Sequence, residues 1–337
     1  MQIKVSDLVA EFLEKKEIKH VFGIIGAGNA HIFDSIKQRG YTEIICVHHE
    51  QAACMAMQTY YRVSGKVTAA ILTTGGGSTN GVTGVVSAWA DSIPGLIISG
   101  NEHSKYIKLH KNVRMWGVQG YDSTSMIEKV TKYSDRILKP QDTIYQLEKA
   151  YAITTQGRPG PCWIDIPMNI QSELIENDRV NLFDGLKGSE LLLEGNGLNS
   201  KVLEILEKLD KSERPLIWLG NGVRLAGAEY LIKELLSKLN IPCIVSWAGI
   251  DLIDSDHPLV YGRAGTYGQR CANFVLQNSD FLICIGTRLS ISQIGYDVNE
   301  LARNAEIAMV DIDENEINKL SERIKYKIVS DAKIFIS

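Results

Sequence analysis

The sequence lacks any apolar run close to the roughly 18 residues that a membrane-spanning helix needs. It also lacks an excess of basic charge, because 36 Lys and Arg residues stand against 40 Asp and Glu residues, for a net charge of −4. Proteins that bind nucleic acid or anionic membranes electrostatically are usually basic. We therefore expect no nucleic acid and no membrane among the partners. Asp7 falls where a signal peptide would turn apolar, so we expect a cytoplasmic protein.

No Cys-x-x-Cys pair occurs among the six cysteines, which argues against a zinc finger or a dithiol redox motif. Cys46, Cys162, Cys243 and Cys284 lie inside apolar, strand-like runs, and this predicts buried, reduced thiols. The run from His48 to Glu50 offers no metal site either, because adjacent residues on a strand point to opposite faces. We predict no metal ligands in this chain.

The glycine-rich turns lack the residues that would complete a nucleotide motif. The turns Gly26–Gly28 and Gly220–Gly222 each follow a strand-like run, but neither has the third glycine of a dinucleotide fingerprint. The turn from Gly75 to Gly81 lacks the Lys-Ser/Thr of a P-loop. Tight βα turns explain the first two, and a glycine turn with Ser78 capping the next helix explains the third. A nucleotide held at a helix N-terminus in the second half stays open.

What is present is a regular alternation of apolar, strand-like runs with helix-like patterns. In the first half the expected strands are 21–25, 44–47, 67–72, 96–99 and 162–167, and the expected helices are 5–13, 29–39, 50–63 and 79–90. In the second half the expected strands are 215–219, 241–245, 281–285 and 307–311, with helices at 202–209 and 226–239. Continuous apolar strands alternating with helices indicate parallel sheets covered on both faces.

The length of 337 residues suggests two domains at about 150 residues each. A polar, glycine-containing stretch interrupts the alternation and predicts a linker over 171–197. We expect an α/β fold of two doubly wound domains, 1–170 and 198–337, on either side of it.

Glu50 opens an expected helix beside Ala52, Ala53 and Met55. A carboxylate among such neighbours would be partly desolvated and could share a proton with a ring nitrogen. Alternatively, Glu50 is a solvated first-turn glutamate that complements the helix dipole. The spacing alone favours the second interpretation.

Six segments occur in an order that is more specific than any one of them: 22–26, His49-Glu50-Gln51-Ala52-Ala53, 64–67, 74–81, 91–94 with 99–100, and 157–167. Together they resemble the pyrimidine-binding domain of thiamine-diphosphate enzymes of the acetolactate synthase and pyruvate oxidase group. The second half resembles the middle domain of that group through 215–222, 261–265, 285–288 and 311–313.

The resemblance implies that Glu50 hydrogen-bonds the aminopyrimidine of thiamine diphosphate and so promotes loss of the thiazolium C2 proton. A 2-oxoacid, pyruvate in the first instance, would then be decarboxylated, and its two-carbon unit transferred to a carbonyl acceptor. The resemblance places Gln119 and Lys132 with Glu50 in the catalytic set. It assigns the thiamine contacts to Ile25, Gly26, Thr74, Gly75, Gly76 and Asn80.

The middle domain binds FAD in several members of the group. The corresponding residues are Gly220, Gly222, Gly286, Arg288 and Asp311. Arg288 is followed by Leu289-Ser290-Ile291-Ser292 where biosynthetic acetolactate synthases have an acidic pair. This departure leaves FAD open, and it leaves open an acceptor such as a keto-sugar that receives the acetyl unit.

No Gly-Asp-Gly triplet occurs, although the family binds the diphosphate through Mg2+ on a third domain that carries one. We therefore expect that this C-terminal domain is absent, that the chain alone is inactive, and that a homodimer or tetramer forms through the pyrimidine-binding domain. The alternatives are a subunit of a split enzyme and a non-catalytic binding or assembly homologue. Both incomplete fingerprints disfavour a nucleotide-dependent oxidoreductase.

Overall fold

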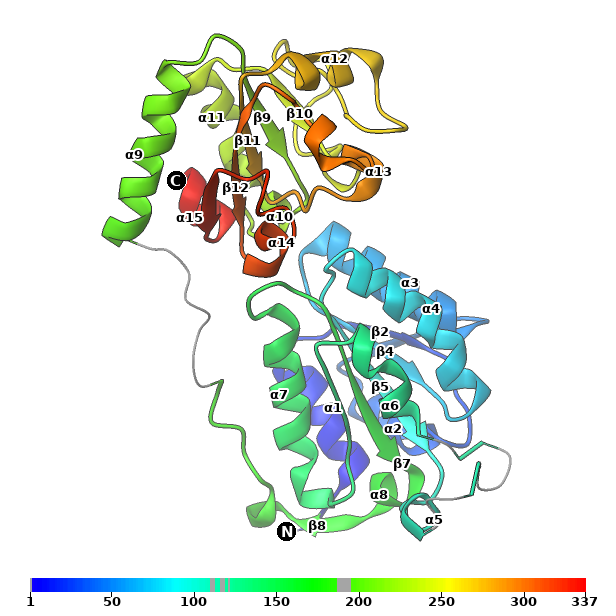
Figure 1. Ribbon diagram of the computed structural model, residues 1–337. Coiled ribbons are helices and arrows are strands. Elements are labelled where there is room, and N and C mark those ends of the chain that lie inside the picture. The colour runs from blue at the N-terminus through cyan, green and yellow to red at the C-terminus, as the bar shows by residue number, and fades with distance from the viewer. Residues whose placement is uncertain (1, 110–112, 116–118, 121, 187–194) are drawn as a thin grey trace. The chain divides into compact units, whose positions relative to one another are not determined.

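The computed structural model describes residues 2–109, 113–115, 119–120, 122–186 and 195–337 (Figure 1). The chain divides into two units, Met1–Gly188 and Ser189–Ser337. Each unit is a parallel sheet with helices on both faces, so the expected doubly wound α/β fold is confirmed.

The sheet of the first unit has six parallel strands in the order β3-β2-β4-β5-β7-β6. The strands are β2 (His20–Gly23), β3 (Glu43–Cys46), β4 (Ala69–Leu72), β5 (Gly95–Asn101), β6 (Tyr133–Arg136) and β7 (Pro161–Pro167). From β2 the chain adds β3 on one side and then crosses to add β4 on the other. The strand order therefore reverses between β2 and β4, which is where doubly wound sheets usually bind ligands.

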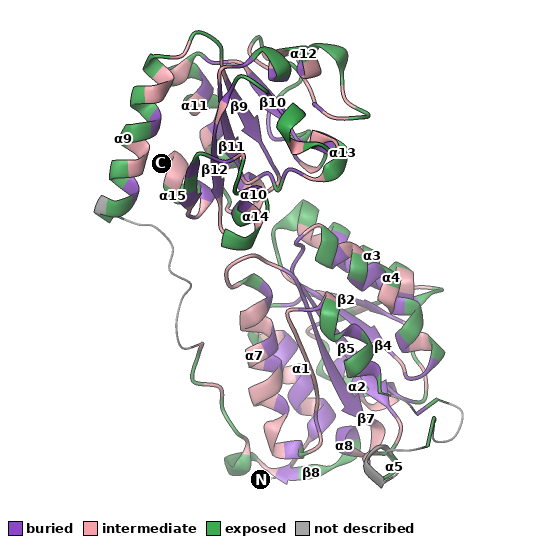
Figure 2. Cartoon of the chain, viewed as in Figure 1, coloured by how far each residue is buried: buried purple, intermediate pink, exposed green. Residues whose placement is uncertain are grey.

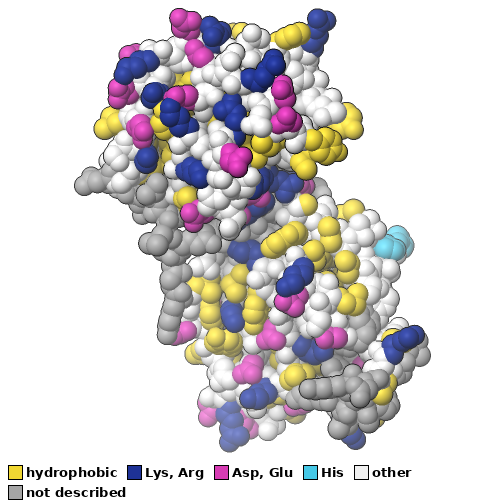
Figure 3. All heavy atoms as spheres, viewed as in Figure 1, with side chains coloured by type: hydrophobic (Ala, Val, Ile, Leu, Met, Phe, Trp, Pro, Cys, Tyr) yellow, Lys and Arg dark blue, Asp and Glu magenta, His cyan; other side chains and the backbone are white. Residues whose placement is uncertain are grey.

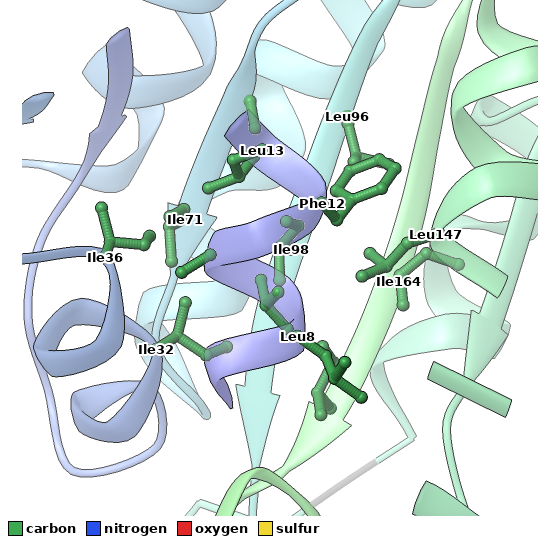
Figure 4. Close-up of a cluster of buried hydrophobic side chains, with 14 of the residues drawn as sticks. Leu8, Phe12, Leu13, Ile32, Ile36, Ile71, Leu96, Ile98, Leu147 and Ile164 are labelled. Carbon is green, nitrogen blue, oxygen red and sulfur yellow. The ribbon is translucent and has the colours of Figure 1, made fainter. Parts of the chain in front are cut away.

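Strand β4 shows why the sheet needs helices on both faces, because all four of its residues are buried. Ala69 and Ile71 face the cluster that α1 (Val5–Lys15), α2 (Ala30–Arg39) and α7 (Thr143–Thr155) also line, and the close-up in Figure 4 shows Ile71 between α1 and α2. Ala70 and Leu72 pack on the other side against α3 (Glu50–Ser64), α4 (Gly76–Ala90) and α6 (Ser123–Ile127). The period of two along the strand thus divides the core into two layers.

The start of the expected linker is instead part of the first unit. Helix α8 (Met168–Ser172) follows β7, and β8 (Leu174–Glu176) pairs antiparallel with β1 (Gln2–Lys4). Ile3 stands opposite Ile175 in this small sheet. The first unit also contains α5 (Ser104–Leu109) and the short 3-10 helices at Glu128–Val130, Pro140–Asp142 and Asn177–Arg179.

The second unit has five parallel strands in the order β10-β9-β11-β12-β13. They are β9 (Pro215–Leu219), β10 (Cys243–Val245), β11 (Phe281–Ile285), β12 (Glu306–Asp311) and β13 (Tyr326–Val329). The helices are α9 (Gly195–Asp210), α10 (Gly222–Leu225), α11 (Ile232–Leu239), α12 (Arg270–Asn278), α13 (Ile291–Ile294), α14 (Glu314–Asn318) and α15 (Ala332–Ile336). Short 3-10 helices lie at Glu229–Leu231, Trp247–Gly249 and Val298–Glu300. As in the first unit, buried residues line both faces of the sheet (Figure 2).

Three expectations need correction. Cys46 is exposed because β3 is an edge strand, whereas Cys162, Cys243 and Cys284 are buried as expected. The helix expected over 226–239 is divided, and α11 begins only at Ile232, after Gly227 adopts a positive φ. The helix expected from residue 79 already begins at Gly76. Within the described residues, no helix is both long and apolar enough to cross a bilayer.

Candidate active site

The residues expected around the thiamine ring follow β2, β3 and β4. Ile25 and Gly26 come after β2, Glu50 after β3, and Thr74 to Gly76 after β4. Because the strands are parallel, these segments meet at the carboxyl edge of one sheet, at the reversal between β2 and β4.

Glu50 is buried although it is the first residue of α3, with 7% of its surface exposed. Its Oε2 accepts a hydrogen bond from Asn80 Nδ2 at 3.0 Å, across the contact between α3 and α4. Residue His49 caps the helix, with Nδ1 accepting from the Gln51 amide at 3.2 Å. The interpretation of a solvated first-turn glutamate is therefore wrong, because α4 covers the carboxylate.

Glycines on α4 allow this close approach. A Cβ on Gly77 would lie 2.8 Å from Glu50 Oε1 and 2.4 Å from Thr73 Cγ2, closer than side chains pack. A Cβ on Gly84 would lie 2.4 Å from Cys54 Cβ, one turn further along α3. Burial raises the pKa of the Cys54 thiol to about 12, and the neighbouring Glu50 charge adds to the rise. The α3–α4 contact is therefore a tightly packed, low-dielectric environment for a carboxylate.

The turn before α4 is built by glycine backbone and not by a side-chain cap. Gly75 precedes the helix with φ +66°, a left-handed conformation that a glycine adopts without strain. Ser78 lies inside the helix and donates its hydroxyl hydrogen to the Thr73 carbonyl at 2.5 Å, so the expected Ser78 cap is wrong.

Gln119 lies against this turn. The Thr74 hydroxyl donates to the Gln119 carbonyl at 3.3 Å, and a Cβ on Gly75 would lie 2.7 Å from Gln119 Cβ. The side chain of Gln119 is exposed. The structure thus places Gln119 beside Gly75 and Glu50 beside Gly77, two residues further along the chain.

The loop after β2 packs against the turn before α4, since a Cβ on Gly26 would lie 2.3 Å from Thr73 Oγ1. The Gly26 amide donates to Asn29 Oδ1 at 2.8 Å, and Asn29 Nδ2 donates to the Ile24 carbonyl at 3.0 Å. Asn29 is fully buried, whereas the side chain of Ile25 is 59% exposed. Sequence reasoning did not select Asn29, Thr73 or Gly77. An asparagine directly after a Gly-x-Gly turn was the available signal for the first of these.

Lys132 is not part of this arrangement. It precedes β6, so it lies at the amino edge of the sheet, whereas Glu50 lies at the carboxyl edge. Its ammonium donates to the Gln156 carbonyl, and its stem packs beside Gly160. Within this unit the structure therefore does not bring Lys132 together with Glu50, and its place in the catalytic set stays a prediction.

The glycines selected in the second unit join two loops at the corresponding reversal, between β9 and β11. The Gly222 amide donates to the Gly286 carbonyl at 2.9 Å, and a Cβ on Gly220 would lie 2.1 Å from that carbonyl oxygen. Backbone packing therefore already accounts for these glycines. Arg288 follows on the same edge and is exposed, and Asp311 ends β12 and accepts from the Asp313 amide at 3.0 Å.

Two buried donors next to these loops, Thr287 Oγ1 and Arg263 Nε, have no hydrogen-bond partner among the residues that the structure describes. The Arg263 guanidinium lies 5.2 Å from the Trp247 ring centre, and the rings of Trp247 and Tyr267 are 6.1 Å apart. Buried polar groups are normally satisfied, so these donors indicate a ligand or water at this edge. Aromatic rings beside a guanidinium and an orphaned hydroxyl suit a nucleotide.

Comparison with known proteins identifies both units. Residues 3–126 match the family described as thiamine pyrophosphate enzyme, N-terminal TPP binding domain. Residues 202–337 match the family described as thiamine pyrophosphate enzyme, central domain.

Several acetolactate synthases are similar to this chain over nearly all of its length. A probable acetolactate synthase large subunit from Methanocaldococcus jannaschii is 32% identical over 333 residues, covering 98% of this chain and 54% of that protein. The acetolactate synthase isozyme 2 large subunit of Escherichia coli is 30% identical, covering 93% of this chain and 55% of that protein. The acetolactate synthase large subunit of Lactococcus lactis is 29% identical, covering 98% and 56%. The chain spans about half the length of these relatives.

Proposed function

The chain belongs to the thiamine pyrophosphate enzymes, and we propose that it is the part of an acetolactate-synthase-like enzyme that activates the pyrimidine ring of the cofactor. The observation that carries the proposal is the burial of Glu50 at the strand-order reversal, in the domain that matches the TPP-binding family. The reaction proposed is decarboxylation of a 2-oxoacid, pyruvate in the first instance, with transfer of the two-carbon unit to a carbonyl acceptor.

The residues present fit the pyrimidine ring. Thiamine pyrophosphate, when bound, supplies an acidic thiazolium carbon and an electron sink. Glu50 would hold the ring nitrogen through its buried carboxylate, and Asn80 would keep that carboxylate in one orientation by its bond to Oε2. Gly77 leaves the space beside Oε1 that any side chain would occupy. Gln119 would stand at the reacting side of the same turn, positioned by Thr74 and Gly75.

The proposal assigns the diphosphate and Mg2+ to a further domain, which the relatives are long enough to contain. It also assigns a homodimer or tetramer to the first unit. Apolar side chains gather over α3, α4 and α6 on the face shown in Figure 3. Met55, Val86, Trp89 and Met126 are among the exposed ones. Exposed patches of this kind commonly mark protein interfaces.

FAD is the proposed ligand of the second unit. Thr287 Oγ1 and Arg263 Nε would find partners on a nucleotide, and Trp247 would offer a ring face. Release of a yellow chromophore when the purified protein is denatured would support this assignment, and a colourless protein would contradict it. The sequence after Arg288 keeps a keto-sugar as the alternative acceptor.

The test of the proposed function is Glu50→Gln in the complete enzyme. The amide keeps the size of the side chain but cannot take up the ring proton. We expect exchange of the cofactor C2 proton to slow by about 10²-fold to 10⁴-fold, as loss of a key acid–base group does. Exchange is followed by NMR after acid quench in deuterated buffer.

Glu43→Gln is the matched control, because it removes one carboxylate from the exposed strand that leads into α3. It should leave exchange unchanged. Exchange near the normal rate in Glu50→Gln would show that Glu50 does not activate the cofactor.

A further inference from the structure

A buried carboxylate lies at the carboxyl end of β7, close to the proposed site but outside it. Asp165 is fully buried, and its Oδ1 accepts from Ser99 Oγ at 2.7 Å. Its Oδ2 accepts from Asn101 Nδ2 at 2.7 Å, Arg136 Nε at 2.6 Å and Ser123 Oγ at 3.1 Å. Each of these donors comes from β5, β6 or the start of α6.

Burying an ion pair of this kind costs desolvation free energy. Burial raises the pKa of Asp165, although Arg136 and the other donors oppose that rise. Buried ion pairs rarely stabilise a fold better than well-packed apolar residues would, and their best attested role is to fix one geometry. The question is therefore which geometry the Asp165–Arg136 pair fixes.

Arg136 extends the network from the core to a surface segment. Its Nη2 donates to Asp122 Oδ1 at 3.1 Å, so one guanidinium bridges two carboxylates. Asp122 is itself the N-cap of α6, accepting from the Ser125 amide at 3.4 Å and from Ser125 Oγ at 2.5 Å. Arg136 thus ties the first residues of α6 to the buried end of β7.

A second contact fixes the chain at Gln119, three residues before Asp122. The Gln119 carbonyl accepts from Thr74, and Gln119 Cβ lies against Gly75. Because only two residues separate the two anchors along the chain, we expect a shift at Asp122 to displace Gln119. The Gly75 turn leads directly to Gly77, which contacts Glu50.

We propose that Arg136 is a positioning residue, which bridges Asp165 and Asp122 so that Gln119 keeps a fixed place beside the Gly75 turn. The effect of Arg136 on catalysis rests on the proposed function, whereas its effect on the position of Gln119 and Asp122 does not. Lysine cannot replace this arginine, because a single ammonium lacks the planar fork that binds two carboxylates at once.

The first test measures positioning directly, by hydrogen–deuterium exchange of the full chain. Arg136→Lys keeps the charge beside Asp165 but removes the bridge. Asp122→Asn keeps an acceptor for the α6 N-cap but removes the ion pair. We expect faster exchange in peptides spanning 119–127 in both variants, with β5 and β7 unchanged. Glu128→Gln, which alters an exposed glutamate that pairs with Lys129 in the same region, should change nothing.

The second test uses the complete enzyme. Arg136→Lys and Asp122→Asn should displace Gln119 without moving Glu50. We therefore expect each variant to lower kcat for two-carbon transfer by about 5-fold to 100-fold while C2-proton exchange stays near normal. Unchanged exchange of the 119–127 peptides, or unchanged kcat, would overturn the proposal. Equal losses of kcat and C2-proton exchange would also overturn it, because they would indicate general loosening of the unit. Failure of the proposed function is separate: it would appear as normal C2-proton exchange in Glu50→Gln.

Discussion

The chemistry of Glu50 depends on neighbours that carry almost no side chain. A glutamate at a helix N-terminus is normally solvated, and its charge is favourable there. Here α4 comes close enough to cover it, because Gly77 and Gly84 face α3. The Asn80 amide then compensates part of the desolvation by a hydrogen bond to Oε2.

Gly77→Ala tests this packing at the residue scale. The added methyl would lie 2.8 Å from Glu50 Oε1 and 2.4 Å from Thr73 Cγ2, so α4 or Glu50 must shift. We expect a loss of about 1–3 kcal/mol in the free energy of unfolding, measured by urea denaturation of the chain.

Gly76→Ala is the matched control one position earlier. Nothing lies within 4 Å of a Cβ there, and Gly76 opens the same helix. Alanine should cost nothing at this position and could gain up to about 1 kcal/mol from helix propensity. Equal effects of the two substitutions would mean that the backbone of α4, and not its contact with Glu50, sets the stability.

The sequence pointed to Glu50 as a candidate site residue, but the burial of its side chain could not be predicted. The motif around it pointed to the residue, whereas local spacing favoured a solvated side chain. Burial comes from a helix that begins 26 residues later in the chain, Gly76–Ala90, so no local pattern contains it. Lys132 shows the converse: its motif suggested the site, but the direction of β6 places it at the opposite edge of the sheet.

At the scale of elements, the strands that are buried on both faces could be predicted, whereas some of the edge strands and short strands were missed. Runs such as Ala69–Leu72 and Phe281–Ile285 are continuous and apolar because helices cover both of their faces. Strand β6, Tyr133–Arg136, was missed because it is a polar edge strand whose Asp and Arg take part in hydrogen bonds. Arg136 in this strand binds Asp165, so the same polar residues that make the hydrogen bonds also hide the strand pattern in the sequence.

The β1–β8 sheet was also missed, since each strand has three residues and the partners lie at opposite ends of the first unit. Ile175 is 6% exposed and packs into the main core, whereas Leu174 beside it is 61% exposed. Ile175→Ala should therefore lower the free energy of unfolding of the first unit by about 2–4 kcal/mol, measured by chemical denaturation.

Leu174→Ala removes a similar side chain from the same strand and is expected to stay within about 0.5 kcal/mol of the wild type. A small effect of Ile175→Ala would mean that β8 does not belong to the folded core, and the linker would then begin near residue 171, as the sequence indicated.

At the scale of the whole molecule, the two units share one topology, a parallel sheet whose strand order reverses once near its middle. In each unit the candidate ligand edge lies where the strand order reverses, between β2 and β4 and between β9 and β11. In each unit, glycines let the loops at that edge approach closely, as Gly26 does against Thr73 and Gly220 against Gly286. The doubly wound topology thus creates both edges, and side chains decide what each can bind.

The apolar cores show the same division, because each buried cluster consists of residues from one unit alone. A substitution in one core should therefore lower the stability of its own unit and leave the other unchanged. Leu13→Ala, in α1, and Leu282→Ala, in β11, each remove a fully buried side chain and should each lower the free energy of unfolding by about 2–5 kcal/mol.

Hydrogen–deuterium exchange near the midpoint of urea denaturation distinguishes the units, since β4 peptides report on the first and β12 peptides on the second. We expect Leu13→Ala to expose β4 at lower urea with β12 still protected, and Leu282→Ala to do the reverse. Each variant is the control for the other. Loss of protection in both units from either substitution would contradict independent cores, and it would mean that the two units unfold as one cooperative body.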